Sequence, residues 1–283
     1  MSSKQRALVT GATSGIGEAA AVQLAERGYE VITLCHERAH GESARERILA
    51  RVPAAEVTLL EADLASLASV RAAAADFVAR SEGRPLDVLI HDAGTTTKAR
   101  EVTEDGFEKM LAVDLIGPFA LTLPLLPLLR AAKPGRIVQL AGVYHRRGHL
   151  DLDDLHFERR EWSMMEANNQ AQLARVLFAC ELAARHDPSE LVANAVHPGA
   201  VLTNAQRDAP WWAKALIHTV ARPAFVRPER GAEPVVRLAT DPSLTGVSGK
   251  FFDRMHEAPL VAQAQDAALR AEMWERLVAM TAG

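Results

Sequence analysis

A glycine-rich turn limits the possible folds of this chain more than any other part of its sequence. The turn, TGATSGIG at residues 10–17, lies directly between a short apolar run and a stretch of helical periodicity. Glycines in such a turn let the backbone approach a pyrophosphate, which then accepts hydrogen bonds from the N–H groups of the following helix. A glycine trio alone is weak evidence, and a simple tight turn is the alternative. The strand before it and the helix after it favour a dinucleotide site. The residues expected to form this site are Gly11, Thr13, Ser14, Gly15, Ile16 and Gly17.

Short apolar runs alternate with longer amphipathic stretches from this turn onward. The expected strands are residues 7–10, 29–35, 56–61, 86–91, 136–141 and 191–196. The expected helices are residues 15–27, 41–51, 66–80, 103–129 and 163–184. Strands that alternate with helices imply right-handed βαβ crossovers and a parallel sheet covered on both faces. Because no internal repeat or linker is present, we predict one doubly wound α/β domain of Rossmann type over residues 1–283.

Composition excludes several classes of partner. The net charge is −4 and no block of basic residues stands out, which argues against nucleic acid or an anionic membrane surface as a partner. The N-terminus is short and polar, and no apolar run is long enough to span a membrane. The two cysteines, Cys35 and Cys180, lie in separate apolar stretches, as is typical of reduced thiols in a cytoplasmic protein. No Cys or His cluster has zinc spacing, so we expect no metal. Since nucleic acid and a membrane surface are disfavoured as partners, we expect a small-molecule substrate. The oligomeric state is left open.

The segment that follows the sixth expected strand departs from this alternation. Residues 200–225 follow Pro198 and contain further prolines and the pair Trp211-Trp212. A partly apolar excursion near the carboxyl ends of the strands is typical of a substrate lid, and a structural cap over the sheet is the alternative.

Further motifs follow the glycine-rich turn in a recognisable order. Asp63-Leu64, Ala93-Gly94 and the triplet HPG at residues 197–199 lie near the ends of three later strands. With the turn, they resemble the short-chain dehydrogenase/reductase family, and GKFF at residues 249–252 and Trp274 are similar to its retinol-dehydrogenase-like branch. The resemblance implies that Asp63 binds near the adenine. It places the other cofactor contacts at Leu64, Ala93, Gly94, Pro198, Gly199 and Thr203.

The end of the second expected strand indicates which nicotinamide cofactor is bound. A carboxylate there would accept a hydrogen bond from the 2′-hydroxyl of NAD and repel a 2′-phosphate. The strand instead ends before His36, and Arg38 lies two residues further on. Glu37 between them weakens the argument, and solvated turn residues are the alternative. We predict NADP(H).

The resemblance also implies that the family's proton-transfer residues are missing. Family members use an Asn, a Ser and a Tyr-x-x-x-Lys pair. The flanking residues place Asp114 where the Asn is expected, Gly142 beside Ala141 where a Ser pair is expected, and Asn168 and Gln172 where Tyr and Lys are expected. A shift of register does not restore the pair, because no lysine lies between Lys133 and Lys214.

The residues near these positions suggest substitutes. Asn168 and Gln172 are four residues apart, so they share one face of a helix and can offer neutral hydrogen-bond donors to the cofactor cleft. Gln172 can also reach a ribose hydroxyl. Tyr144 and His145 are the nearby candidate acids. Asp114 either holds a kinked helix or orders a water.

Three interpretations of this pattern are open: a nucleotide-binding pseudoenzyme that acts as a sensor or scaffold, an enzyme whose proton transfer is handled differently, and another reaction on the same fold. An intact cofactor pattern beside a missing acid–base set resembles atypical ketoreductases of angucyclinone biosynthesis. We therefore expect an NADPH-dependent ketoreductase acting on a bulky apolar, aromatic polyketide ketone, with the proton supplied by substrate or water.

Overall fold

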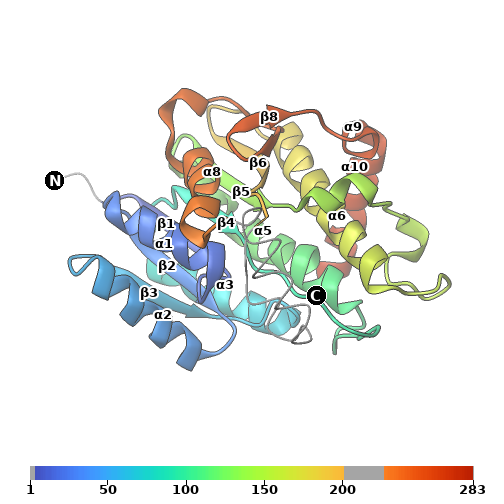
Figure 1. Ribbon diagram of the computed structural model, residues 1–283, viewed down its shortest axis with the longest axis horizontal. Coiled ribbons are helices and arrows are strands. Elements are labelled where there is room, and N and C mark those ends of the chain that lie inside the picture. The colour runs from blue at the N-terminus through green and yellow to red at the C-terminus, as the bar shows by residue number, and fades with distance from the viewer. Residues whose placement is uncertain (1–3, 201–225, 283) are drawn as a thin grey trace.

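The computed structural model of the chain describes residues 4–200 and 226–282 (Figure 1). Thr203 and the proposed lid beyond Ala200 lie outside the described residues. The backbone N–H of Val226 donates to the carbonyl of Ala200 over 2.8 Å, so the described chain leaves and returns at one point beside Pro198 and Gly199.

Eight strands of the described chain form one sheet in the order β3-β2-β1-β4-β5-β6-β7-β8. The strands are β1 Arg6–Thr10, β2 Glu30–Cys35, β3 Val57–Glu61, β4 Val88–His91, β5 Gly135–Leu140, β6 Leu191–His197, β7 Phe251–Asp253 and β8 His256–Ala258. Neighbouring strands pair in parallel except β7 and β8, which pair antiparallel. The predicted doubly wound α/β fold is confirmed, with the addition of an antiparallel strand at one edge.

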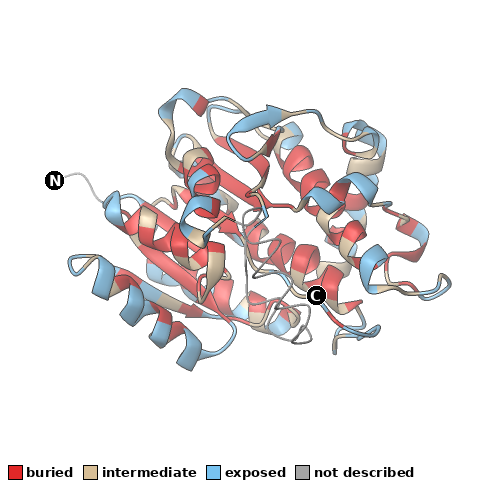
Figure 2. Cartoon of the chain, in the orientation of Figure 1, coloured by how far each residue is buried: buried red, intermediate tan, exposed pale blue. Residues whose placement is uncertain are grey.

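Helices cover both faces of the sheet because successive strand residues point to opposite sides. Leu8 and Leu89 belong to one apolar core, and Val9 and Ile90 belong to the other. The first core packs on α3 Leu67–Ser81, α5 Gly117–Ala131, α6 Met164–Arg185 and α10 Ala267–Thr281; the second packs on α1 Gly15–Glu26, α2 Arg38–Arg51 and α8 Pro228–Thr240. Figure 2 shows these two buried layers beside the sheet, with exposed residues on the outer helical faces.

The order of the strands places a crevice above β1 and β4. The chain winds from β1 to β3 in one direction and from β4 to β6 in the other, so the loops after β1 and β4 diverge. In doubly wound sheets, ligands bind at this switch point, outside the carboxyl ends of the strands. The glycine-rich turn follows β1, and Asp92 follows β4, at this crevice.

The prediction of a helix over residues 103–129 is wrong at its start. Val102 and Glu108 form an antiparallel bridge, and Gly106 has a φ of +87°, so the chain turns before any helix begins. The helix begins as α4 Lys109–Leu111, widens into the π-helical turn η1 Ala112–Ile116 and continues as α5. By length and composition alone, Lys109–Ala131 is apolar enough to cross a membrane, but 72% of its most apolar window is buried within the domain. Packing against the sheet explains this apolarity.

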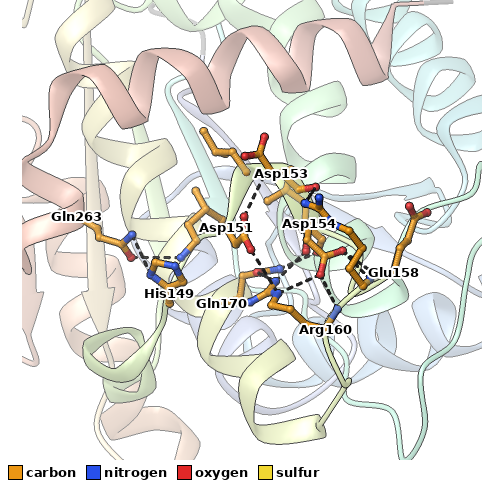
Figure 3. Close-up of polar contacts among 12 residues, drawn as sticks. His149, Asp151, Asp153, Asp154, Glu158, Arg160, Gln170 and Gln263 are labelled. Carbon is orange, nitrogen blue, oxygen red and sulfur yellow. Dashed lines mark hydrogen bonds and ion pairs between the residues drawn. The ribbon is translucent and has the colours of Figure 1, made fainter.

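A buried carboxylate fastens the loop between β5 and α6 (Figure 3). Asp154 accepts hydrogen bonds from the backbone N–H groups of Glu158, Arg159 and Arg160, at 2.7, 3.2 and 2.9 Å, and from the Arg160 side chain. Arg160 also donates to Gln170 on α6 over 3.0 Å. Burial opposes ionisation of Asp154, but these hydrogen bonds together lower its pKa to about 2. The loop is therefore tied to the helix that carries Asn168 and Gln172.

We predict that Asp154→Ala lowers the free energy of unfolding at pH 7 by about 2–3 kcal/mol, because it leaves three partly buried backbone N–H groups without their acceptor. Since the folded-state pKa is depressed, the carboxylate stabilises the protein above its ordinary pKa of 3.8, and this contribution is lost as the pH falls toward about 2. Urea unfolding at pH 7 and pH 3 measures both effects. The neighbouring Asp153→Ala, in an exposed ion pair with Arg276, is the control and should cost less than about 1 kcal/mol. Equal losses for the two variants would contradict this account.

Candidate functional site

The glycine-rich turn leaves no room for side chains at its two ends. Gly11 has a φ of +70° and Gly15 a φ of +61°, conformations that glycine adopts readily. A Cβ at Gly17 would lie 2.5 Å from the carbonyl oxygen of Gly11 and equally close to the Asp92 carboxylate. The turn therefore lies in close contact with the residues that follow β4, and its other side faces the crevice.

A groove with a volume of about 750 Å³ runs along this crevice. Ser14 precedes α1 without a side-chain hydrogen bond to the helix, so the first N–H groups of α1 are not capped by it. Free N–H groups beside glycines form a cradle for a pyrophosphate. The groove brings together most residues expected at the dinucleotide site: Gly11, Thr13, Ser14, Gly15, Ile16, His36, Asp63, Leu64, Ala93, Gly94 and Gln172. Asp114 and Asn168, which were expected as catalytic residues, also line the groove.

Of the two basic residues expected at the 2′-phosphate, one lines the groove and the other does not. His36 lines the groove, and its Nε2 lies 3.3 Å from the Asp63 carboxylate. Arg38 is not among the lining residues, because it begins α2 and its guanidinium lies 3.7 Å from Glu42, one turn further along the same helix. His36 is therefore the basic side chain that this conformation presents to the adenosine end of the groove.

A second cavity of about 460 Å³ adjoins the other end of the groove. The two share the residues Ile16, Asp92, Gly94, Thr96, Asn168 and Gln172. Tyr144, Met164, Met165, Gly142, Pro198 and Gly199 also line this cavity. A ligand in the groove and a second ligand in this cavity would thus meet at the face of α6 that carries Asn168 and Gln172.

A chain of hydrogen bonds orients Gln172. Its side-chain oxygen accepts from the backbone N–H of Gly142 over 2.6 Å, and its amide nitrogen donates to Asp114 over 3.2 Å. Asp114 lies in the π-helical turn and also accepts from the N–H of Thr95 over 3.1 Å. In the described part of the chain, the Asn168 side chain has no hydrogen-bond partner. It is therefore available to a ligand, whereas Gln172 has only its second amide hydrogen to offer.

The two candidate acids lie in unequal positions on the 3-10 turn η2 Val143–Arg147. Tyr144 is 45% exposed at the mouth of the second cavity. His145 is buried outside both cavities, with Nδ1 2.8 Å from the carbonyl oxygen of Gly142 and its ring against Phe251. Burial lowers the pKa of His145, which disfavours the protonated ring that an acid requires. We therefore do not retain His145 as a candidate acid.

Two charged residues at the site were missed by sequence reasoning. Asp92 follows β4 and lines both cavities, and Arg175 on α6 is 2% exposed beside Asp114. The available signal was a charged residue inside an apolar run, which occurs at Arg175 in the stretch LARVLF at residues 173–178. Among the described residues, no group of three His, Cys, Asp or Glu side chains is arranged to hold a metal ion.

Comparisons with known proteins agree with this geometry. The family profile for short chain dehydrogenases matches residues 5–150. Retinol dehydrogenase 13 of Homo sapiens is 36% identical over 282 residues, covering 97% of this chain and 85% of that protein. Polyprenol dehydrogenase of Mus musculus is 38% identical over 283 residues, covering 97% and 83%. The crystal structure of a point variant of actinorhodin polyketide ketoreductase with NADPH has a TM-score of 0.71 at 23% identity, covering 89% of this chain and 97% of that one.

The carboxyl group of Asp92 should make stability depend on pH. Burial raises its pKa from 3.8 to about 7, against the opposing effects of Arg175 and the Gly17 N–H. The folded protein therefore binds more protons than the unfolded chain between these values, and its stability should fall as the pH rises through this window. We predict that Asp92→Asn, which keeps an acceptor for Gly17, removes this part of the slope and stabilises the protein at pH 8.

Urea unfolding of both proteins at pH 5 and pH 8 measures the difference. An unchanged slope in the variant would show that the Asp92 carboxyl is ionised in the folded protein throughout this range.

Proposed function

The chain belongs to the short-chain dehydrogenase/reductase family, and we propose that it is an NADPH-dependent ketoreductase whose substrate is a bulky apolar ketone. The observation that carries this proposal is a pair of adjoining cavities that share the wall formed by Asn168 and Gln172. One is the dinucleotide groove, and the other is the second cavity, whose opening is lined by apolar side chains. A cofactor and a second small molecule can therefore be bound in contact.

The second cavity suits an apolar substrate. Tyr144, Met164 and Met165 are 45%, 47% and 49% exposed around it. Exposed large apolar side chains that gather at a cavity mark a binding surface, and methionines adapt to ligands of varied shape. The names of the two relatives, a retinol and a polyprenol dehydrogenase, also refer to apolar compounds.

The groove fits a nicotinamide dinucleotide, which supplies a hydride when it is bound. The start of α1, which Ser14 does not cap, and the glycines at 11 and 15 would hold the pyrophosphate, and His36 would face the adenosine 2′-phosphate. At the other end, the free amide hydrogen of Gln172 and the amide of Asn168 would bind the nicotinamide ribose and orient the substrate carbonyl.

The proposed reaction proceeds without a tyrosine and lysine pair. The side chains on the shared wall of α6 are amides, which do not transfer protons near neutral pH. Correct orientation of hydride donor and carbonyl supplies a large part of the rate, whereas general acid catalysis typically adds about 10²–10⁴-fold. The carboxyl group of Asp92 also lines both cavities, but it accepts the N–H of Gly17 within the glycine-rich turn. We therefore assign the proton to the substrate or to water.

An aromatic polyketide of the angucyclinone kind meets this requirement. Such polycycles carry a phenol beside a ketone, and that phenol can donate a hydrogen bond to the alkoxide as it forms. The fold shared with the actinorhodin ketoreductase is compatible with this substrate class. The alternative, a pseudoenzyme that binds NADP(H) as a sensor, is favoured only by the amides on α6 and does not require the apolar cavity.

We predict tighter binding of NADPH than of NADH, and a roughly tenfold smaller preference in His36→Ala, because that variant removes one hydrogen bond to the 2′-phosphate. Calorimetric titration of both cofactors measures the preference. Arg38→Ala is the matched control and should change it less, since Arg38 pairs with Glu42 away from the groove. Tighter binding of NADH by the unaltered chain would overturn the assignment of NADP(H).

The mechanism predicts that no single side chain is indispensable as an acid. Tyr144→Phe, Asn168→Ala and Gln172→Ala should each lower kcat by roughly tenfold, the scale of one ordinary hydrogen bond, whereas loss of a true general acid costs about 10²–10⁴-fold. Loss of NADPH absorbance with a polycyclic ketone reports the rate, and the same ketone with its adjacent phenol methylated is the matched control. A larger loss of kcat in one variant, with cofactor binding intact, would identify that residue as a protein acid. If no such ketone is reduced although NADPH binds, the sensor function would be favoured.

A further inference from the structure

Arg175 is a buried cation within an otherwise apolar part of α6. Its neighbours Leu173, Ala174, Val176 and Leu177 are fully buried, and Arg175 itself is 2% exposed. A buried charge is costly unless it is paired and hydrogen bonded, and an apolar side chain in its place is often equally stable. A guanidinium at this position therefore needs an explanation beyond packing.

The contacts of Arg175 converge on the nicotinamide end of the site. One amino group donates to the carbonyl oxygen of Leu140 at the end of β5 over 2.9 Å. The other donates to the carbonyl of Ala93, just after β4, and lies 3.3 Å from the Asp114 carboxylate. A Cβ at Gly94 would lie only 2.9 Å from the guanidinium. Arg175 thus ties together the ends of two strands, the π-helical turn and the floor of the cofactor groove.

Through Asp114, Arg175 acts on Gln172, which lies three residues earlier on the same helix. Asp114 accepts the amide hydrogen of Gln172, and this bond directs the Gln172 oxygen toward the N–H of Gly142. Burial raises the pKa of Asp114, and Arg175 opposes that rise. A protonated Asp114 would lose acceptor capacity toward its partners, so the cation preserves the acceptor that orients Gln172.

We propose that Arg175 is a positioning residue that supplies the fixed positive charge beneath the nicotinamide end of the cofactor site and, through Asp114, holds Gln172 in its binding orientation. The inference rests on the proposed function because it requires NADP(H) in the groove. It assigns a role to a side chain that lines the second cavity but belongs neither to the lining of the cofactor groove nor to the set of residues expected from the sequence.

The test compares two ligands that differ only at the nicotinamide end. NADPH occupies the whole groove, whereas 2′-phospho-ADP lacks both the nicotinamide ring and the ribose that Gln172 would bind. Arg175→Met should weaken NADPH binding by roughly tenfold, the scale of one hydrogen bond, and change the binding of the fragment by less than about twofold. Arg175→Lys should recover part of the loss because it keeps the charge. Fluorescence titration measures both ligands.

Two further comparisons separate positioning from general destabilisation. Arg6→Met removes another buried arginine, 3% exposed and bonded at the opposite end of the sheet, and should weaken neither ligand. Adding Arg175→Met to Gln172→Ala should weaken NADPH binding by less than a further twofold, because both act through Gln172. If Arg175→Met does not fold, Asp114→Asn should show the loss expected for it, and Arg175→Lys a smaller loss, each confined to NADPH.

Equal losses for NADPH and the fragment, or losses that multiply in the double variant, would overturn the positioning role while leaving NADPH binding by the unaltered chain intact. Failure of the unaltered chain to bind NADPH would overturn the proposed function and this inference with it. A loss confined to NADPH that disappears in the Gln172→Ala background is the expected result.

Discussion

The close approach of the glycine-rich turn to the end of β4 is the constraint on which the rest of the site depends. Gly17 lies against the carbonyl of Gly11 and the carboxylate of Asp92, and any side chain there would separate the two strands at the switch point. Because β1 and β4 are neighbours and their loops diverge, this contact sets the depth of the groove and the direction in which α1 leaves it. The pyrophosphate cradle, the shared wall at α6 and the second cavity are all located relative to this contact.

Electrostatics at the site differ between its two ends. The adenosine end is open and solvated, where His36 and Asp63 form an exposed pair. At the nicotinamide end, the buried guanidinium of Arg175 faces the carboxyl groups of Asp92 and Asp114. In such a place, hydrogen bonds are strong and unpaired polar groups are costly. At this end of the site, a ligand therefore meets hydrogen-bonding groups that are held in fixed orientations.

The sequence predicted the framework because that framework depends on local patterns. Short apolar runs located β1 to β6 to within about two residues, although β3 at the sheet edge is only partly buried, and the turn before α1 located the groove. The strands β7 and β8 are three residues each, too short for an alternating pattern to identify. The start of the helix at Lys109 was missed because the turn at Gly106 is stabilised by a bridge between Val102 and Glu108. Asp92, Asp114 and Arg175 act together only because the fold brings distant segments into contact, which periodicity does not report.

The hydrogen bond between Ala200 and Val226 has a consequence for how this protein can diverge. It closes the described backbone at the junction between β6 and α8, so the position of either element does not depend on the length of chain inserted between them. Loop length affects closure entropy only weakly. A change in the number of residues between Ala200 and Val226 should therefore leave β6 and α8 in place, and this junction borders Pro198 and Gly199 at the second cavity.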